Sequence, residues 1–546
     1  MLILGVGCSG HDFSSSLIAD GKILVSIEEE RLSKEKHGTG ARSQLLRSVD
    51  YCLDESGFGW DDIDYIVSVN PSEYSSIHAH KFEKRHTINH HLAHCASAFY
   101  CSGFDEAACL VVDGLGTSFT DDYGEAISCY MASANEITPI DKILCRSPKY
   151  DSQASSDDLF DKWHSLGNFY SIITLLCGFS FLQEGKTMGL APYGTDRYVN
   201  DFRKFVTFGI SNGRPHFDFM RLEMISFGKE LIRKEQIGRT LYEVKADIAY
   251  AGQSILEEIL LELLHYLYNR TKCKKLAYSG GVALNSVFNG KIIKNTPFEQ
   301  VFVFPAAGDS GNGIGAGLYW YYNVCKKPYI PRRLESVYLG KVYKEDEIIK
   351  SLEKHQDKLI YERLKYIDIV GKAAQALSEE HIIGWFQGRS EIGPRALGNR
   401  SILASPINGD MKDMLNSKIK FRESFRPFAP VVLAEMVHEY FETDFPDNPY
   451  MLFVANTLES KRNEVPAIVH VDGSARVQTV SRDDNEIYYN LVKEFYTLTG
   501  VPMLINTSFN IKGKPIVETP DDAVQSFLNC DMDDLFIYNY YIRKKH

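Results

Sequence analysis

Three histidines lie within five positions of the chain, in the stretch INHHLAHCASAFY at residues 88–100. His90 and His94 are four residues apart, so on a helix that begins near His90 they share one face, and His91 points elsewhere. Two imidazoles on one helical turn are half of a common kind of metal site, and carboxylates on distant loops usually supply the other half. Such a pair is more often merely capped or partly buried, so both interpretations stay open.

Two aspartates are candidates for the missing half. Asp113 follows the apolar stretch ACLVV and precedes Gly-Leu-Gly, and Asp309 follows FVFPAAG and precedes Ser-Gly-Asn-Gly. Both should stand at strand ends, where side chains can face a cleft, although an Asp before Gly is more often a turn former or a helix cap. The pattern indicates a metal site with four candidate ligands: His90, His94, Asp113 and Asp309.

A second candidate site is basic. Its residues are Arg389, Arg395, Arg400, Lys418, Lys420, Arg422 and Arg426. The planar fork of arginine suits phosphate and carboxylate. Gly-Pro, Ala-Leu-Gly and Phe-Arg-Pro-Phe-Ala-Pro lie between these residues, and such stretches are unlike a solvated helix face. We therefore expect Lys420 and Arg426 to face one pocket, with Phe421 and Phe425 packed behind them.

Polar side chains also follow an apolar strand in MLINTSFNIKGKPI, at residues 503–516. Asn506, Thr507, Ser508 and Asn510 stand there, and their hydroxyls and amides could cap a phosphate. They could equally form an ordinary strand-to-turn transition.

The elements that must position these residues are strands that end in Gly-rich turns. Such turns occur at Gly5–Gly7, Asp113–Gly116, Gly280–Gly281 and Gly308–Gly317. Two lie early and two late, with helices between, which predicts a pseudo-duplicated α/β domain that holds a nucleotide between its halves. Glycine lets backbone N–H groups approach a phosphate, and a helix N-terminus adds positive potential.

Several single elements can be predicted as well. Asp20-Gly21 suits a hairpin turn, and apolar spacing indicates a long helix over about residues 241–270. We expect one continuous helix over ALNSVFNGKII, residues 283–293. KKPYIPRRLESVYLG, residues 326–340, breaks periodicity and is typical of a linker before a second α/β segment.

Composition limits the functional classes. The chain has 546 residues, 44% hydrophobic and 24% charged, with net charge −12. This is a globular composition with room for two or more domains, and its acidity argues against a large nucleic-acid surface. Eleven cysteines without a C-x-x-C pair indicate free thiols rather than disulfides or a zinc ribbon. We find no signal peptide and no membrane-length apolar run, so we expect a cytoplasmic protein.

The motifs together resemble one known family. They are NHHLAHCASAFY, VVDGLG, EGKTMGLAPYG, SGGVALNSVFNGKI, AAGDSGNGIGAG, EIGPRALGNRSIL, KFRESFRPFAP and LINTSFNIKGKPI. In this order they resemble the NodU/CmcH family of O-carbamoyltransferases, which act on nodulation factors and on antibiotics. The resemblance implies a Kae1-like domain of the duplicated actin/hexokinase type at residues 1–340. A YrdC-like α/β domain would follow at residues 341–546.

The resemblance also implies chemistry. Carbamoyl phosphate and ATP, with Mg²⁺ as a possible accompanying ion, would form carbamoyladenylate in the YrdC-like domain. The intermediate is unstable in water and should travel through a protected channel. The Kae1-like domain would transfer the carbamoyl group to a hydroxyl of a small-molecule acceptor, a natural product or a sugar, beside iron(II), with manganese or zinc as alternatives. A nucleic-acid or membrane partner is not expected, and a homodimer is an open alternative.

Matched motif by motif, the family's functional residues fall on this chain as follows. The metal ligands would be His90, His94, Asp113 and Asp309. His11 and Lys36 would be catalytic residues near the transferred group, and His11 could take the acceptor proton. Substrate and nucleotide would bind Arg395, Lys420, Arg426, Arg476, Asn506, Ser508, Gly280, Gly281 and Asn285.

The chain departs from the family pattern in one loop. After Asp113 it reads GLGTSFTDDYGE, whereas an acidic residue is expected soon after the second glycine, and Asp121 and Asp122 come later. Acceptor contacts are expected within residues 37–85 and 115–240.

Three rival functions remain. Threonylcarbamoyl transfer to tRNA uses related domains, but the acidic pI of about 5.8 speaks against a tRNA surface. Hydrogenase-maturation carbamoyltransferases carry extra zinc-finger and acylphosphatase segments, which we do not find in this sequence. A catalytically inactive nucleotide-binding relative is the third, and the intact histidine and aspartate set argues against it.

Overall fold

A computed structural model of the chain describes residues 1–7, 11–38, 47–69, 83–119, 123–146, 164–445 and 447–545. These residues form two compact units. The first takes described residues from 1–22 and 61–335, and the second takes them from 23–41, 46–60 and 336–546. Both units mix helices with sheets, which confirms the predicted α/β class. The functional division at residue 340 stays a prediction.

The first unit opens with a sheet built on the buried strand β1 (Leu2–Gly7). β1 pairs antiparallel with β2 (Ser14–Ala19) and parallel with β4 (Tyr65–Ser68), which pairs parallel with β5 (Arg85–Thr87). After β2, Asp20 and Gly21 have φ of 47° and 80°. Two positive φ values are what a tight hairpin turn requires, so the predicted turn is confirmed. β3 (Lys22–Glu28) then carries the chain into the second unit.

A second sheet repeats this pattern. β6 (Glu106–Val112) pairs antiparallel with β7 (Tyr123–Ser133) and parallel with β11 (Lys275–Ser279), and β11 pairs parallel with β12 (Gln300–Val303). β8 (Glu136–Arg146) extends the antiparallel side. The order β7-β6-β11-β12 matches β2-β1-β4-β5, and the predicted duplication is therefore confirmed.

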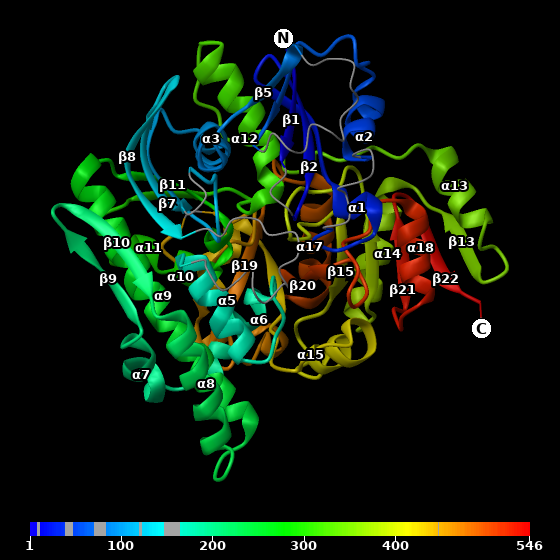
Figure 1. Ribbon diagram of the computed structural model, residues 1–546. Helices are drawn as coiled ribbons and strands as arrows, with labels where there is room; N and C mark the ends of the chain where they lie inside the picture. Colours follow the sequence, from blue (N-terminus) through cyan, green and yellow to red (C-terminus); the bar gives the residue numbers. More distant parts are fainter. Residues whose placement is uncertain are drawn as a thin grey trace, which may run out of the picture. The chain divides into compact units, whose positions relative to one another are not determined.

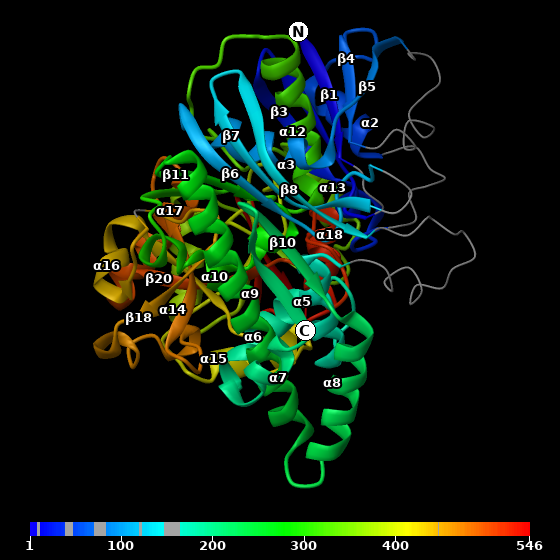
Figure 2. The ribbon, with the colours of Figure 1, turned by 60° about the vertical axis from the view of Figure 1, so that its left-hand side comes forward.

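The duplication also relates two helices. α3 (His90–Ser102) follows β5, α12 (Asn312–Tyr319) follows β12, and the two pack against each other (Figure 1). Glycine permits the close approach, because a Cβ on Gly315 would lie 1.9 Å from the carbonyl oxygen of Ala93. The same two helices lie side by side in Figure 2. This packing brings the starts of both helices to one place.

Helices fill the chain between β8 and β11. They are α5 (Leu166–Leu176), α6 (Glu184–Leu190), α7 (Val199–Arg203), α8 (Arg221–Glu235) and α9 (Leu241–Thr271), with a hairpin of β9 (Val206–Ser211) and β10 (Arg214–Phe219). α9 confirms the predicted long helix, and Thr240 and Glu243 form a capping box at its start. No helix among the described residues combines the length and apolar composition needed to cross a membrane.

The expected continuous helix over residues 283–293 is wrong. The chain forms a 3₁₀ turn (Gly281–Leu284) followed by α10 (Ser286–Asn289) and α11 (Ile292–Asn295). Asn285 causes the first break, since its ψ of 85° is not helical and its side chain accepts a hydrogen bond from Phe288 N at 3.1 Å. The asparagine thus ends one turn and caps the next.

The second unit is built on a ten-stranded mixed sheet. Its order is β13 (Leu359–Arg363), β22 (Tyr540–Lys544), β21 (Asp534–Ile537), β14 (Ile383–Phe386), β15 (Arg400–Ala404), β20 (Met503–Ser508), β16 (Ala429–Leu433), β19 (Ser474–Val480), β18 (Phe453–Thr457) and β17 (Phe441–Glu442). The longer helices are α2 (Arg47–Ser56), α13 (Glu345–Glu353), α14 (Tyr366–Ser378), α17 (Glu486–Thr499) and α18 (Pro520–Leu528). The central strands β14, β15, β16 and β20 carry mostly buried apolar side chains, and their ends and connections bear the polar residues described below.

Candidate metal centre and anion site

The histidine pair is positioned by the start of α3. Asn89 is the N-cap, and its side-chain oxygen accepts a hydrogen bond from Leu92 N at 3.0 Å. The helix therefore begins at His90, and His94 lies one turn further on the same face. Their Nε2 atoms are 3.0 Å apart, so the two rings converge as the spacing predicts.

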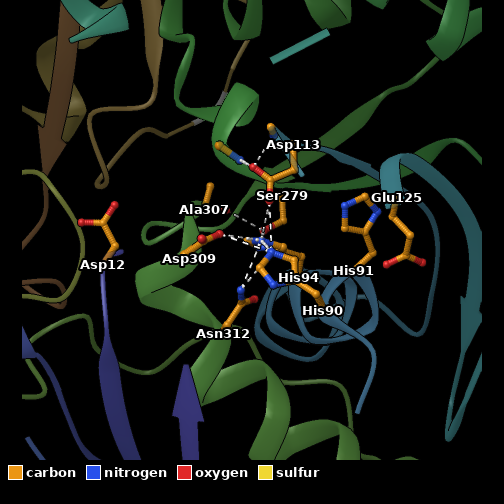
Figure 3. A network of polar contacts seen from close by, with 12 residues as sticks. Asp12, His90, His91, His94, Asp113, Glu125, Ser279, Ala307, Asp309 and Asn312 are labelled. Atoms are coloured by element: carbon orange, nitrogen blue, oxygen red, sulfur yellow. Dashed lines mark hydrogen bonds and ion pairs between the residues drawn. The ribbon is translucent and has the colours of Figure 1, made fainter. Parts of the chain in front are cut away.

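Both predicted aspartates meet this pair (Figure 3). Oδ2 of Asp113 lies 3.1 Å from His90 Nε2 and 3.3 Å from His94 Nε2. Oδ1 of Asp309 lies 3.3 Å from each of the same two nitrogens. All four side chains are buried, and one potential ligand atom from each lies within 4.8 Å of the others. The structure thus brings the four predicted ligands together.

Neighbouring groups hold the ligands in orientation. Oδ1 of Asp113 accepts hydrogen bonds from Gly114 N at 2.8 Å and Gly281 N at 3.1 Å, which leaves Oδ2 facing the imidazoles. Ser279 Oγ lies 3.4 Å from Nδ1 of His94 and donates to Ala307 O. Such contacts set the orientation of a metal-binding histidine.

Asn312 is a residue that the sequence analysis missed. Its Nδ2 lies 3.4 Å from His90 Nε2 and 3.3 Å from His94 Nε2. In Figure 3 it approaches the imidazoles from another direction than Asp113. The sequence feature that could have identified Asn312 is its position three residues after Asp309, where α12 begins.

The charges of this cluster suit a cation. Burial disfavours charged imidazole, yet Asp309 and Asp113 raise the pKa of His90 to about 10. The two carboxylates also raise the pKa of His94. In turn, the two histidines lower the pKa values of Asp113 and Asp309 well below the usual range of aspartate. Two nitrogens and two oxygens fit iron(II), manganese or zinc better than calcium. These residues could therefore hold a divalent transition metal in place of protons.

His11 borders the cluster. Its Nδ1 lies 3.0 Å from Asp12 Oδ2, and its Nε2 lies 3.9 Å from Asp309 Oδ2. Burial lowers the pKa of His11, but Asp12 and Asp309 outweigh burial and raise it to about 9.

The three other residues predicted in this unit support the scaffold. Gly280 has φ of 93°, and a Cβ there would lie 2.3 Å from Val112 O. Gly281 donates to Asp113, as described. Asn285 exchanges hydrogen bonds with the amide of Gln253, at 2.9 and 3.2 Å. Their role in nucleotide binding stays a prediction.

The second unit gathers cations. Arg395, Lys420, Arg426 and Arg476, the four basic residues predicted to bind substrate, lie close enough to affect one another's pKa, and Arg422 joins them. We call these five residues the cation pocket. Burial and then Arg426 lower the pKa of Arg395 to about 10. Burial, Arg395, Arg422 and Arg426 lower the pKa of Arg476 well below its usual range.

The cation pocket comes from neighbouring elements of one sheet. Arg395 lies between β14 and β15, Arg476 lies on β19, and Lys420 and Arg426 precede β16. Arg426 Nη1 lies 4.0 Å from Glu423 Oε2. The pKa of Arg426 is nevertheless lowered, because burial lowers it more than the charge of Glu423 raises it. Mutual repulsion among these cations favours the binding of an anion, and substrate binding at this place stays a prediction.

Lys420 is anchored at the end of β20. Its ammonium donates to Asn510 Oδ1 at 2.8 Å and Asn510 O at 3.1 Å, and it contacts the carbonyl oxygen and hydroxyl of Ser508. Asn510, one of the polar residues expected to cap a phosphate, thus accepts hydrogen bonds from Lys420. Lys36, predicted as catalytic, is exposed and belongs to the second unit, and its charge contributes to the lowered pKa of Lys420.

Two expectations about the basic stretches need correction. Phe421 does not pack behind the pocket, because it is 49% exposed with φ of 47°, whereas Phe425 is buried as predicted. Arg389 and Arg400 are structural: their guanidinium groups donate to backbone carbonyl oxygens, among them Leu24 O and Gln387 O.

Asn506 connects the elements around the pocket. Its Nδ2 donates to Ala396 O at 3.0 Å and to Gln478 Oε1 at 2.7 Å. Its predicted contact with substrate stays a prediction. Among the segments predicted to contact the acceptor, residues 39–46, 70–82, 120–122 and 147–163 lie outside the described residues, and Asp121 and Asp122 are among them.

Comparisons with known proteins cover both units. The family model "Carbamoyltransferase N-terminus" matches residues 2–78 and 74–318, and "Carbamoyltransferase C-terminus" matches residues 374–544. Nodulation protein NolNO of Sinorhizobium fredii is 35% identical over 98% of this chain and 79% of its own length. Nodulation protein NolO of Bradyrhizobium diazoefficiens is 37% identical over 84% of this chain and 79% of its own length.

Among solved structures, full-length HypF in its phosphate- and nucleotide-bound form is 13% identical. It covers 59% of this chain and 55% of its own, with a TM-score of 0.38. The two family models and the two nodulation proteins agree with the motifs that run through the sequence. The chain belongs to the carbamoyltransferase family.

Proposed function

We propose that this carbamoyltransferase is ATP-dependent and forms O-carbamates on a hydroxyl of a small molecule, a natural product or a sugar. The cation pocket is the observation that carries the proposal, because five buried or half-buried cations that repel one another call for a polyanionic substrate. Carbamoyl phosphate and ATP supply that charge.

The first half-reaction would take place in the cation pocket. Carbamoyl phosphate and water give carbamate and phosphate, and a carbamate oxygen then attacks the α-phosphorus of ATP. That bond forms as the bond to pyrophosphate breaks, which leaves carbamoyladenylate. Arg395, Arg426 and Arg476 would stabilise the charge that develops on the departing pyrophosphate. Lys420, held by Ser508 and Asn510, would bind a phosphate oxygen.

The second half-reaction would take place beside His90, His94, Asp113 and Asp309. The acceptor hydroxyl attacks the carbamoyl carbon, AMP leaves with the bonding electron pair, and the hydroxyl proton passes to a base. His11 stands beside the cluster and is our candidate for that base in its neutral form, which a cation bound by Asp309 and Asp113 would favour by countering the charges that raise the pKa of His11. A bound divalent metal, for which we favour iron(II) over manganese and zinc, would supply Lewis acidity.

The cellular setting that we propose is the cytoplasm. The cysteines among the described residues are free thiols, and most are buried. Free thiols agree with a reducing compartment.

A pyrophosphate-release assay tests the proposal. Purified protein with carbamoyl phosphate and ATP, without acceptor, should release pyrophosphate, and omission of carbamoyl phosphate should stop the release. Arg395→Ala and Arg476→Ala should abolish it. Metal removal should leave this release intact and stop carbamate formation on an added hydroxyl compound, followed by mass spectrometry. A protein that releases no pyrophosphate under any of these conditions would contradict the proposal.

A further inference from the structure

Glu125 on β7 is a fully buried carboxylate that contacts two of the three segments bearing the candidate metal ligands, the start of α3 and the loop after Asp113. Its Oε2 accepts hydrogen bonds from Asn89 Nδ2 at 2.8 Å and from Thr117 N at 3.3 Å. Its Oε1 contacts the ammonium of Lys142. In Figure 3, Glu125 lies beside His91, on the opposite side of the imidazole pair from Asp309.

The contact with Asn89 controls how α3 begins. Asn89 uses both ends of its amide, since Oδ1 caps the helix through Leu92 N and Nδ2 donates to Glu125. An amide that lost this acceptor could rotate and turn its NH₂ group toward Leu92 N, and the cap would be lost. Glu125 therefore stabilises the orientation that starts the helix at His90.

The contact with Thr117 controls the loop after Asp113. Gly116 N donates to Glu125 O at 2.7 Å, and Glu125 N donates to Thr117 O at 3.1 Å. Thr117 Oγ1 in turn accepts from His90 N at 2.9 Å. Glu125 thus holds the loop that carries Asp113, and this loop holds the first residue of α3.

We propose that Glu125 is a positioning residue of the metal centre, which fixes the spacing between Asp113 and the pair His90 and His94. The inference rests on the proposed metal site, because a ligand set with wrong spacing would bind metal weakly. It goes beyond that site by assigning a role to a residue that need not touch the metal. Lys142 is its counter-ion, so a buried carboxylate is tolerated here.

The test is Co²⁺ binding to metal-free, full-length protein. Glu125→Met, which removes both acceptor oxygens at similar side-chain length, should weaken Co²⁺ binding about 10- to 100-fold, the usual effect of losing a partner that orients metal ligands. The visible absorption of the bound Co²⁺ should change too, because the coordination geometry changes. Pyrophosphate release in the second unit should stay at the parent's rate.

Two further variants separate positioning from general stability. Thr117→Val removes the hydroxyl that His90 N needs and should also weaken Co²⁺ binding, whereas Thr117→Ser should retain it. Thr240→Ala removes the capping box of α9, which no metal-ligand contact involves, and should lower thermal stability without changing Co²⁺ affinity. If Glu125→Met does not fold, the two Thr117 variants carry the test.

The outcomes distinguish the two proposals. A parent protein that binds no Co²⁺, or an Asp309→Ala protein that binds it as tightly as the parent, would overturn the metal centre and this inference with it. A parent that binds Co²⁺ and a Glu125→Met protein with the same affinity and the same absorption would overturn the inference alone. Equal affinity in Thr117→Val and Thr117→Ser would also overturn it.

Discussion

The candidate metal centre and the cation pocket differ in how their buried charges are arranged: the first pairs opposite charges, and the second gathers like charges. In the metal centre, buried carboxylates face buried imidazoles, and the pKa of His90 rises to about 10. In the cation pocket, buried cations face one another, and the pKa of Arg395 falls to about 10. Opposite charges already pair in the first site, whereas like charges in the second await a ligand. The charges of the metal centre thus neutralise one another within the protein, whereas the charges of the cation pocket require an anion from solution.

This difference predicts opposite responses to the loss of one charge. Removal of a carboxylate from the metal centre leaves buried positive charge without its partner, which destabilises the fold. Removal of a cation from the pocket relieves repulsion and weakens only ligand binding.

The largest effect should come from Asp309→Ala. We expect the metal-free protein to lose about 3–5 kcal/mol of unfolding free energy, the usual result of breaking a buried pair. Carbamoyl transfer should stop, and pyrophosphate release should continue. Denaturant titration and the two assays measure this. Asp218→Ala, which removes an exposed carboxylate paired with His164, is the matched control and should change little.

The next largest effect should be on substrate binding in the cation pocket. Lys420→Ala or Arg426→Ala should remove a bond to a charged group, worth about 1.5–3 kcal/mol, and so raise the substrate concentration required roughly 10- to 100-fold. Arg426→Lys should rescue only part, because lysine keeps the charge and loses the fork. Titration of the two substrates, carbamoyl phosphate and ATP, checks this. Lys418→Ala, an exposed neighbour, should behave like the parent.

A smaller effect should appear in stability without ligand. Arg476→Met should raise the unfolding free energy by about 0.5–2 kcal/mol, a usual gain from relieving an unfavourable charge. Added pyrophosphate should stabilise the parent more than the variant, because only the parent keeps the full cluster. Thermal unfolding with and without pyrophosphate measures both. A variant less stable than the parent in the absence of ligand would remove the contrast between the two sites.

The smallest effect should be a pH dependence from Lys420. Burial, then Arg422 and Arg426, lower the pKa of its ammonium well below the usual value for lysine. Between the folded and unfolded pKa the unfolded chain binds more protons, so this group makes stability rise with pH. As pH rises through the folded pKa, at the lower edge of this window, Lys420 in the folded protein loses its charge, and pyrophosphate affinity should fall. Lys420→Arg should flatten the pH profile of pyrophosphate binding. Identical profiles in parent and variant would assign the dependence to another group.

Local spacing explains which site residues could be predicted. His90 and His94 share a helical face because four residues make about one turn. Asp113 directly follows β6, as the apolar run before it indicates, whereas β12 ends at Val303 and Asp309 begins a 3₁₀ turn (Asp309–Gly311) further along the chain, so its expected place at a strand end is wrong. Arg395, Lys420 and Arg426 stand in basic stretches whose composition is unlike a solvated helix face, whereas Arg476 lies in a separate stretch and only the family resemblance identified it.

Long-range contacts explain what could not be predicted. Asn312 joins the histidines because α12 packs on α3, and Glu125 meets Asn89 because β7 pairs beside β6. Neither contact leaves a trace in local spacing. Phe421 was predicted from its neighbours to be buried, yet a positive φ turns the chain at that position and exposes it.

Residue types and local periodicity were thus sufficient for the α/β class, the hairpin at Asp20-Gly21 and the chemistry of the four metal-ligand candidates. The orientation of each ligand, the supporting hydrogen bonds and the mutual repulsion of the buried cations emerged only in the folded chain. The reason is physical: hydrogen-bond geometry and pKa depend on burial and on groups far away in sequence, which the tertiary packing alone brings within reach.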